Sequence, residues 1–255
     1  MRIVSLFISI LAAFGTCSCS SGTKAAPPEN TILYTTDGVV LGATVYRPAA
    51  AERPPGLVLI HRYGGNRSVW EGFARNAQQA GMLVVAIDLR GHGDSTGGEG
   101  KPLHYSRLSE AELLNSLLDL EAATKFVRDN GAHPENLALM GEGLGANLAL
   151  RYTLQSPDIQ AVVMISPGLE YNGVETEDAI RRLKDCPALL VASEGDAYSA
   201  LSAAALKQAA PVFAELRTWP GSSHGADIFA THAESMQYIL HWLGNILSAK
   251  DASPS

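Results

Sequence analysis

The chain has 255 residues, of which 46% are hydrophobic and 18% are charged, and its formal net charge at pH 7 is −7. This composition is typical of one globular domain with a complete hydrophobic core, and it excludes a largely disordered chain. Because Lys and Arg are scattered rather than clustered, it also excludes a basic surface for nucleic acid.

The amino-terminal residues 1–19 resemble an export signal. Arg2 precedes an apolar run from Ile3 to Phe14, which is too short to cross a bilayer as a helix and is followed by small residues. A cysteine after such a run resembles the bacterial lipobox, which implies cleavage and lipidation at Cys17 or Cys19. We therefore expect an exported lipoprotein anchored to a membrane of the bacterial cell envelope. A secreted or periplasmic protein with a simple cleaved signal is the alternative.

The rest of the chain divides into three parts by composition. Residues 20–30 are small, polar and contain proline, which predicts a flexible tether. The folded domain is expected over residues 31–249, and a disordered tail over residues 250–255. Cys186 is the only cysteine of the domain, so it cannot form an internal disulfide, and we expect it in the core.

The domain begins with a hairpin pattern and continues with buried strands. Strand-like residues 31–35 and 39–47 flank Asp37-Gly38, which is a strong turn signal. Short runs that are almost wholly apolar follow, and these are typical of parallel strands covered by helices on both faces. The runs are 57–60, 83–87, 137–140, 162–165 and 189–191, with a more polar one at 213–219.

Helical patterns separate these runs, and the alternation predicts one doubly wound α/β domain with a mostly parallel sheet. The stretch 166–185 is the only sizeable insertion expected at the ligand face, so we expect a minimal lid and an open site. The predicted helices are 69–80, 108–127, 144–154, 199–208 and 226–247.

Five polar or glycine-rich motifs follow the apolar runs. Ligands of open α/β sheets bind beyond the carboxyl ends of the strands, so these motifs are expected to share one edge. One of them passes from a strand into a helix, as the G-x-S-x-G nucleophile elbow does. In chain order the motifs are His61-Arg62-Tyr63-Gly64-Gly65, Asp88-Leu89-Arg90-Gly91-His92-Gly93-Asp94-Ser95, Gly141-Glu142-Gly143-Leu144-Gly145, Ser193-Glu194-Gly195-Asp196 and Gly221-Ser222-Ser223-His224-Gly225.

In order and spacing these motifs resemble those of the α/β-hydrolase superfamily, in its lid-poor esterase and peptidase-like branch. The resemblance implies that Asp196 orients His224, the general base. It also implies an oxyanion hole formed by the backbone N–H groups of Tyr63 and Leu144, a small acyl-ester or carboxylate-like ligand, and no cofactor. Asp196 has a second interpretation, as the cap of the helix that follows it.

Two positions depart from the family pattern. Gly143 stands where the serine nucleophile is usual, and Arg62 stands where the oxyanion loop usually has glycine. Glycine has no atom that can attack a carbonyl, so we expect a pseudoenzyme that keeps its ligand pocket but is impaired in acyl-enzyme chemistry. The alternative is an active hydrolase that uses water activated by His224 or an unrecognised nucleophile.

The neighbouring polar residues receive other roles. Glu142 is expected to point away from the reacting centre, and Ser166 to shape the pocket. A remote alternative is dinucleotide binding, because Gly141 to Ala146 also fits G-x-G-x-x-A. We expect His61 and His92 to hold loops by hydrogen bonds, and no metal-binding spacing is present in the sequence.

Overall fold

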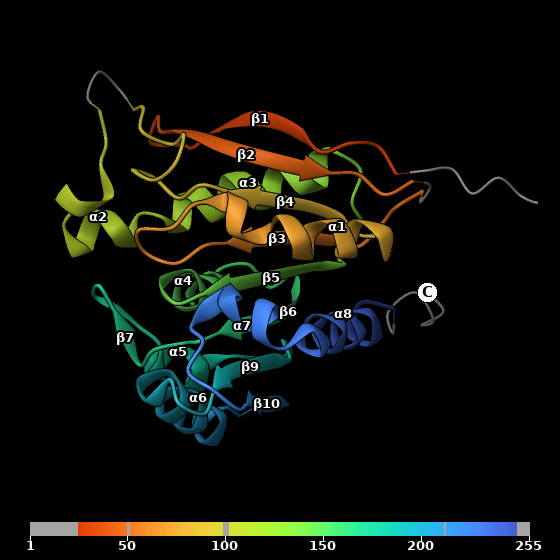
Figure 1. Cartoon of the computed structure of the whole chain (residues 1–255). Coiled ribbons are helices and arrows are strands. Elements are labelled where there is room, and N and C mark those ends of the chain that lie inside the picture. Colours follow the sequence, from red (N-terminus) through yellow and green to blue (C-terminus); the bar gives the residue numbers. More distant parts are fainter. Residues whose placement is uncertain (1–24, 50–51, 99–101, 212, 249–255) are drawn as a thin grey trace, which may run out of the picture.

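The computed structural model describes residues 25–49, 52–98, 102–211 and 213–248 (Figure 1). The expected lipobox with Cys17 and Cys19 and the expected tail at 250–255 lie outside the described residues. Within those residues, none of the helices is both long and apolar enough to span a membrane.

Eight strands form one sheet in the order β1-β2-β4-β3-β5-β6-β9-β10. β1 and β2 form an antiparallel hairpin, β2 pairs antiparallel with β4, and the remaining neighbours are parallel. The prediction of a mostly parallel α/β sheet with an amino-terminal hairpin is therefore confirmed. The strands are β1 (Glu29–Tyr34), β2 (Val40–Tyr46), β3 (Gly56–Ile60), β4 (Leu83–Ile87), β5 (Leu137–Glu142), β6 (Ile159–Ile165), β9 (Ala188–Ser193) and β10 (Ala214–Trp219).

Helices cover both faces of the sheet, as Figure 1 shows. Val58 and Ile60 of β3 join the core on the α3, α4 and α6 side, whereas Leu57 and Leu59 join the core on the α1 and α8 side. Because each face is buried, β3 and β4 are apolar at every position. The helices are α1 (Glu71–Gln79), α2 (Glu110–Leu114), α3 (Leu117–Asp129), α4 (Leu144–Thr153), α5 (Glu177–Arg182), α6 (Ala197–Ala209), α7 (Ile228–Thr231) and α8 (Ala233–Ser248).

Two of the longer expected helices are each divided in the structure. The pattern at 108–127 divides into α2 and α3, and Ser109 starts α2 with a reciprocal capping box to Glu112. The pattern at 226–247 divides into a 3₁₀ turn at Gly225–Asp227, α7 and α8. Hydrophobic spacing continues through such breaks because consecutive short helices can bury the same side.

The amino-terminal boundary and the insertion also differ in detail. β1 begins at Glu29, inside the stretch expected as a tether, and Gln78 Nε2 donates a hydrogen bond of 2.8 Å to the Ala26 carbonyl oxygen. The described part of that stretch is therefore packed against α1. The insertion at 166–185 contains a short hairpin, β7 (Glu170–Tyr171) and β8 (Val174–Glu175), followed by α5.

Candidate functional site

Gly143 forms the turn between the end of β5 and the start of α4. Its backbone has φ 52° and ψ −120°, a conformation that costs a residue with a side chain about 1 to 3 kcal/mol. The glycines on either side have a packing reason. A Cβ atom at Gly141 would lie 2.2 Å from the Gly145 carbonyl oxygen, and one at Gly145 would lie 2.4 Å from that of Ile60. Close packing of strand, turn and helix thus accounts for the glycine pattern without a dinucleotide.

His224 and Asp196 form a hydrogen-bonded pair beside this turn. The distance from His224 Nδ1 to Asp196 Oδ2 is 2.7 Å. Asp196 precedes α6, but its side chain makes no capping hydrogen bond, so its carboxylate serves the histidine instead. With Nδ1 as the donor to this carboxylate, Nε2 is left as an acceptor. A Cβ atom at Gly143 would lie 3.4 Å from that nitrogen, so His224 faces the place where the side chain of a serine at position 143 would begin.

The two expected oxyanion donors lie in the adjoining backbone. Among the described residues, neither the Tyr63 nor the Leu144 backbone N–H donates a hydrogen bond to a backbone or side-chain acceptor. The preceding amide in the loop is already used, because Arg62 N donates to Glu142 Oε1 at 3.3 Å. This pattern is compatible with two donors kept for a ligand oxygen.

Arg62 lies against the turn at Gly143. A Cβ atom at position 143 would come within 3.1 Å of the Arg62 Cβ atom, which is closer than ordinary side-chain packing. The Arg62 guanidinium continues past the turn, where Nη1 lies 3.2 Å from Glu142 Oε2 and 3.6 Å from Asp227 Oδ2. The arginine is thus held by two carboxylates and crowds the site where a nucleophile would start.

Glu142 is buried, with 1% of its side chain exposed, and it connects two loops of the site. Besides contacting Arg62, Glu142 Oε2 accepts a hydrogen bond of 2.7 Å from the Ala226 N–H. The preceding amide, Gly225 N–H, donates to Ser166 Oγ at 2.9 Å. Two consecutive amides that follow His224 are therefore fixed to the ends of β5 and β6.

This arrangement explains residues whose role the sequence left open. The function of Glu142 as the link between the two loops was not predicted. Gly225 has φ 62°, and a Cβ atom there would lie 2.0 Å from Glu142 Oε2, so a side chain at this position would be strained and would displace the linking carboxylate. The available signal was a pair of opposite charges, Arg62 and Glu142, at two motif positions just beyond the paired ends of the neighbouring parallel strands β3 and β5.

His61 and His92 support the oxyanion loop. His61 Nε2 accepts from Leu89 N–H at 3.0 Å, and His92 Nε2 accepts from Gly64 N–H at 3.1 Å. The Nδ1 atoms lie 2.7 Å and 3.0 Å from the carbonyl oxygens of Arg62 and Arg90, respectively. Burial lowers the pKa of His61 to about 3 and also lowers the pKa of His92, so both rings stay neutral. Both ring nitrogens of each residue are occupied within the fold.

The hairpin of the insertion forms one wall of the site. The Tyr171 ring of β7 is edge-on to the His224 ring, with 6.4 Å between their centroids. Tyr171 also packs against Tyr198 of α6, and its hydroxyl lies 3.2 Å from Ser199 Oγ. The insertion thus places an aromatic side chain beside His224.

Cys186 and metal ligation were the other two questions that the sequence raised. Cys186 is buried, and burial raises the pKa of its thiol to about 12, so it is a core residue. Over the described ranges, no three His, Cys, Asp or Glu side chains gather as potential metal ligands.

Comparison with known proteins decides the family. Residues 53–193, more than half of the chain, match the family model Hydrolase_4, described as serine aminopeptidase, S33. The chain belongs to this family. The matched region contains the oxyanion loop and the elbow at Gly143 and ends before Asp196 and His224. The geometry described above supplies the placement of those two residues.

Named relatives include a cutinase and a monoacylglycerol lipase. Cutinase est2 from Thermobifida alba is 28% identical over 149 residues, covering 58% of this chain and 45% of the cutinase. A monoacylglycerol lipase from Mycolicibacterium smegmatis is 30% identical over 121 residues, covering 46% of this chain and 40% of the lipase. These matches span less than half the length of each relative.

Solved structures share the fold. The α/β hydrolase GrgF from Penicillium sp. sh18 has a TM-score of 0.74 at 15% identity, covering 88% of this chain and 100% of GrgF. The esterase Pf2001 from Pyrococcus furiosus has a TM-score of 0.67 at 17% identity, covering 87% of this chain and 93% of the esterase. The α/β-hydrolase fold predicted from the motifs is therefore confirmed for this member of the S33 family.

Proposed function

We propose that this protein binds a small acyl-ester or carboxylate-like ligand beside Gly143 without forming an acyl-enzyme. The observation that carries the proposal is the glycine itself, which occupies the nucleophile position and faces the His224–Asp196 pair. Removal of the serine from a serine protease costs on the order of 10⁶ in rate, or roughly 8 kcal/mol of barrier. A site with this arrangement is a binding site inherited from a hydrolase.

The groups around Gly143 favour an oxygen-bearing ligand. The Tyr63 and Leu144 amides supply donors for a carbonyl or carboxylate oxygen, and the Tyr171 ring supplies an apolar wall for an attached chain. The relatives named cutinase and monoacylglycerol lipase support an ester-type ligand. Arg62 contributes little net charge, because Glu142 and Asp227 already neutralise it.

Hydrolysis by activated water is a second candidate, and the position of His224 favours it. Nε2 lies 3.4 Å from the point where a side chain at Gly143 would begin, so a water molecule beside the glycine would be within reach of the base. The water oxygen would attack the ester carbonyl while His224 takes its proton, and the histidine would then return that proton to the leaving alkoxide. No covalent enzyme intermediate forms on this route.

Binding and turnover measurements separate the two candidates. Saturation-transfer NMR with butyrate, and with butyramide, which resists hydrolysis, is expected to show binding to the natural protein. Leu144→Pro should abolish this binding, because proline has no N–H and so removes an oxyanion donor. Position 144 is the first of α4, where a helix tolerates proline. Leu144→Ala, which loses the same buried side chain but keeps the amide, is the matched control and should leave binding intact. Absence of butyrate and butyramide binding would contradict a ligand site.

The natural protein is expected to hydrolyse p-nitrophenyl butyrate no faster than the His224→Gln variant does. Turnover that requires His224 but shows no burst of p-nitrophenol would establish the water route instead. A burst would contradict both candidates, because it reports an accumulating acyl-enzyme.

We also propose that the chain is an exported lipoprotein with its folded domain tethered to the envelope membrane. The support is the signal-like pattern before Cys17 and Cys19. Intact-mass analysis of the protein isolated from a bacterial host should show a diacylglyceryl adduct that either Cys17→Ser or Cys19→Ser removes. A cleaved, unlipidated chain would support the secreted or periplasmic alternative.

A further inference from the structure

Ser166 directly follows the last residue of β6, and its backbone conformation is unusual. Its φ is 48°, in the left-handed region that glycine adopts without strain and that most other residues avoid. Among the described residues, Asn172 and Asp185 are the other non-glycine residues with positive φ, and asparagine and aspartate are the types that tolerate this conformation. Serine is therefore the exception, and its backbone at this position is strained.

The Ser166 hydroxyl holds a specific partner. Ser166 Oγ accepts a hydrogen bond of 2.9 Å from the Gly225 N–H, and both residues are buried. Leaving that buried amide without an acceptor would cost about as much free energy as the strained backbone does, so the two contributions to stability roughly cancel. Glycine at position 166 would adopt the same φ without strain. Stability thus gives little reason for a serine here, whereas the position that its Oγ fixes does.

The amide that Ser166 holds belongs to the peptide bond after His224. Because a peptide bond is planar, the Gly225 N–H and the His224 Cα atom lie in one plane, so holding the amide also holds the backbone from which the imidazole projects. The ring itself is held by the hydrogen bond of 2.7 Å between Nδ1 and Asp196 Oδ2. The backbone and the ring of the histidine are therefore fixed by two separate contacts.

The end of β6 also holds the turn at Gly143. The Ile165 carbonyl oxygen accepts from the Gly143 N–H at 3.0 Å, and the Ser166 N–H donates to the Val191 carbonyl oxygen at 2.7 Å. Two consecutive residues of one strand end thus contact both the turn and the loop of His224. This common support places His224 Nε2 opposite position 143, where a Cβ atom would lie 3.4 Å from it.

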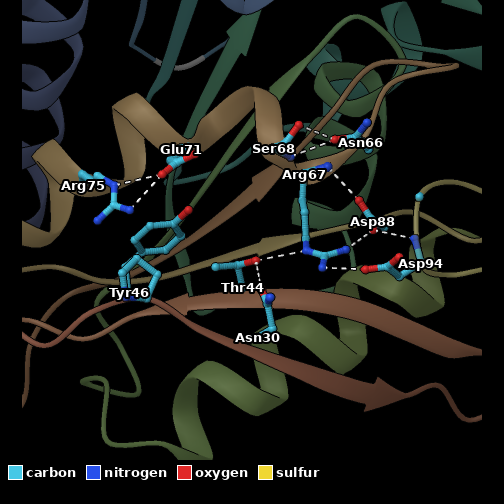
Figure 2. Close-up of a pocket in the computed structure, with 12 residues that line it drawn as sticks. Asn30, Thr44, Tyr46, Asn66, Arg67, Ser68, Glu71, Arg75, Asp88 and Asp94 are labelled. Atoms are coloured by element: carbon cyan, nitrogen blue, oxygen red, sulfur yellow. Dashed lines mark hydrogen bonds and ion pairs between the residues drawn. The ribbon is translucent and has the colours of Figure 1, made fainter.

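The hollow between β2 and the start of α1 offers a contrast. It has a volume of about 490 Å³, and its charged side chains are paired with one another (Figure 2). Arg67 Nη2 donates to Asp94 Oδ2 at 2.7 Å, and Arg75 Nη2 lies 2.8 Å from Glu71 Oε1. None of the three non-glycine residues with positive φ in the described ranges lines this hollow. The strained serine belongs instead to the sheet edge that carries His224.

We propose that Ser166 is a positioning residue that orients His224 toward position 143. The strained backbone places Oγ at the Gly225 amide, and the amide holds the histidine where Nε2 meets a ligand or a water molecule beside Gly143. Strain of this kind persists where the surrounding structure uses it. The role rests on the proposed function of the site, but the orientation of His224 is measurable without any ligand.

Proton NMR of the full chain tests the orientation of His224. The hydrogen bond from Nδ1 to Asp196 should give a downfield proton signal, which His224→Gln removes and thereby assigns. In Ser166→Gly this proton should exchange with water about tenfold faster, because the backbone of the histidine is no longer held. The urea midpoint of Ser166→Gly should stay near that of the natural protein, since strain and hydrogen bond are lost together. Asn172→Gly, which removes a positive φ of 52° elsewhere in the insertion, is the matched control and should keep the exchange rate.

Two further measurements make the outcome decisive. Ser166→Ala keeps the strained backbone but loses the acceptor, so it should unfold at a lower urea concentration than Ser166→Gly and show the same fast exchange. In Arg62→Gly/Gly143→Ser, adding Ser166→Gly should slow labelling by a fluorophosphonate, which reacts with activated serines, about tenfold.

The proposal is overturned if the natural protein lacks the His224 signal, or if Ser166→Gly exchanges this proton as slowly as the natural protein does. It is also overturned if Asn172→Gly speeds the exchange as much as Ser166→Gly, or if Ser166→Gly labels as fast as its parent. Absence of butyrate binding would contradict the proposed function of the site and would leave the NMR result unchanged, so the two failures are distinguishable.

Discussion

Arg62 and Gly143 fit together because position 143 carries no side chain. A Cβ atom there would lie 3.1 Å from the Arg62 Cβ atom, so a larger residue at 143 requires Arg62 to shift by a few tenths of an ångström. The two residues are also the two departures from the hydrolase motifs in this chain. We infer that the departures are coupled, and that restoring the serine alone does not restore a hydrolase.

A pair of variants tests this coupling. Gly143→Ser alone should lower the free energy of unfolding by about 1 to 3 kcal/mol, because the turn has a positive φ and Arg62 crowds the new side chain. Arg62→Gly/Gly143→Ser should hydrolyse p-nitrophenyl acetate at least about tenfold faster than Gly143→Ser alone. Lowering the activation barrier by about 1.4 kcal/mol gives that factor.

The matched control for this pair is Arg62→Gly/Gly143→Ala, which has the same backbone changes and no hydroxyl. It should be inactive. Coupling between the two positions is disproved if Gly143→Ser alone hydrolyses the ester as fast as the double variant. Adding His224→Gln to the active variant should return it to background.

Glu142 should stabilise the site loops through its charge. In Glu142→Gln the side chain keeps its size, but Arg62 loses a carboxylate partner and the Ala226 amide loses a charged acceptor. We expect the free energy of unfolding to fall by about 1.5 to 3 kcal/mol, the usual range for hydrogen bonds to charged groups. Urea denaturation measures this change. Glu194→Gln, an exposed control near the same site, should change it by less than about 0.5 kcal/mol.

His61 should make stability depend on pH in a predictable direction. Burial lowers the pKa of this histidine from 6.5 to about 3, so the unfolded chain takes up a proton at a higher pH than the folded protein does. The contribution of the neutral His61 ring to the free energy of unfolding is fully present above pH 6.5 and is lost as the pH falls toward 3. This group alone should reduce the free energy of unfolding by about 2 kcal/mol between pH 7 and pH 5.

Comparison with His61→Gln isolates that contribution, because other titrating groups are common to both proteins. The stability difference between the natural protein and the variant should shrink by about 2 kcal/mol over that pH interval. An unchanged difference from pH 7 to pH 5 would show that His61 takes up its proton in the folded state at its ordinary pKa.

Much of the fold was predictable because burial on both faces leaves a direct mark on the sequence. The apolar run Leu83–Ile87 coincides with β4, and the turn at Asp37-Gly38 joins β1 to β2. Boundaries were less predictable where local capping competes with hydrophobic spacing. Ser109 and Glu112 start a short separate helix inside a longer helical pattern.

The site was predictable where a motif carries the chemistry in its own residues. His224 and Asp196 follow from their positions after β10 and β9, and the structure brings them together at 2.7 Å. The link through Glu142 was not predictable, because it depends on where the loops that carry Arg62 and Ala226 meet in space.

Covalent labelling tests the central claim most directly. The natural protein is incubated with a fluorophosphonate, which reacts with activated serine nucleophiles, and its intact mass is measured. Because Gly143 offers no hydroxyl to the His224–Asp196 pair, the mass should not change, whereas Arg62→Gly/Gly143→Ser should gain one adduct at position 143 that His224→Gln prevents. A stoichiometric adduct on the natural protein, with loss of ester turnover, would contradict the account by revealing another nucleophile.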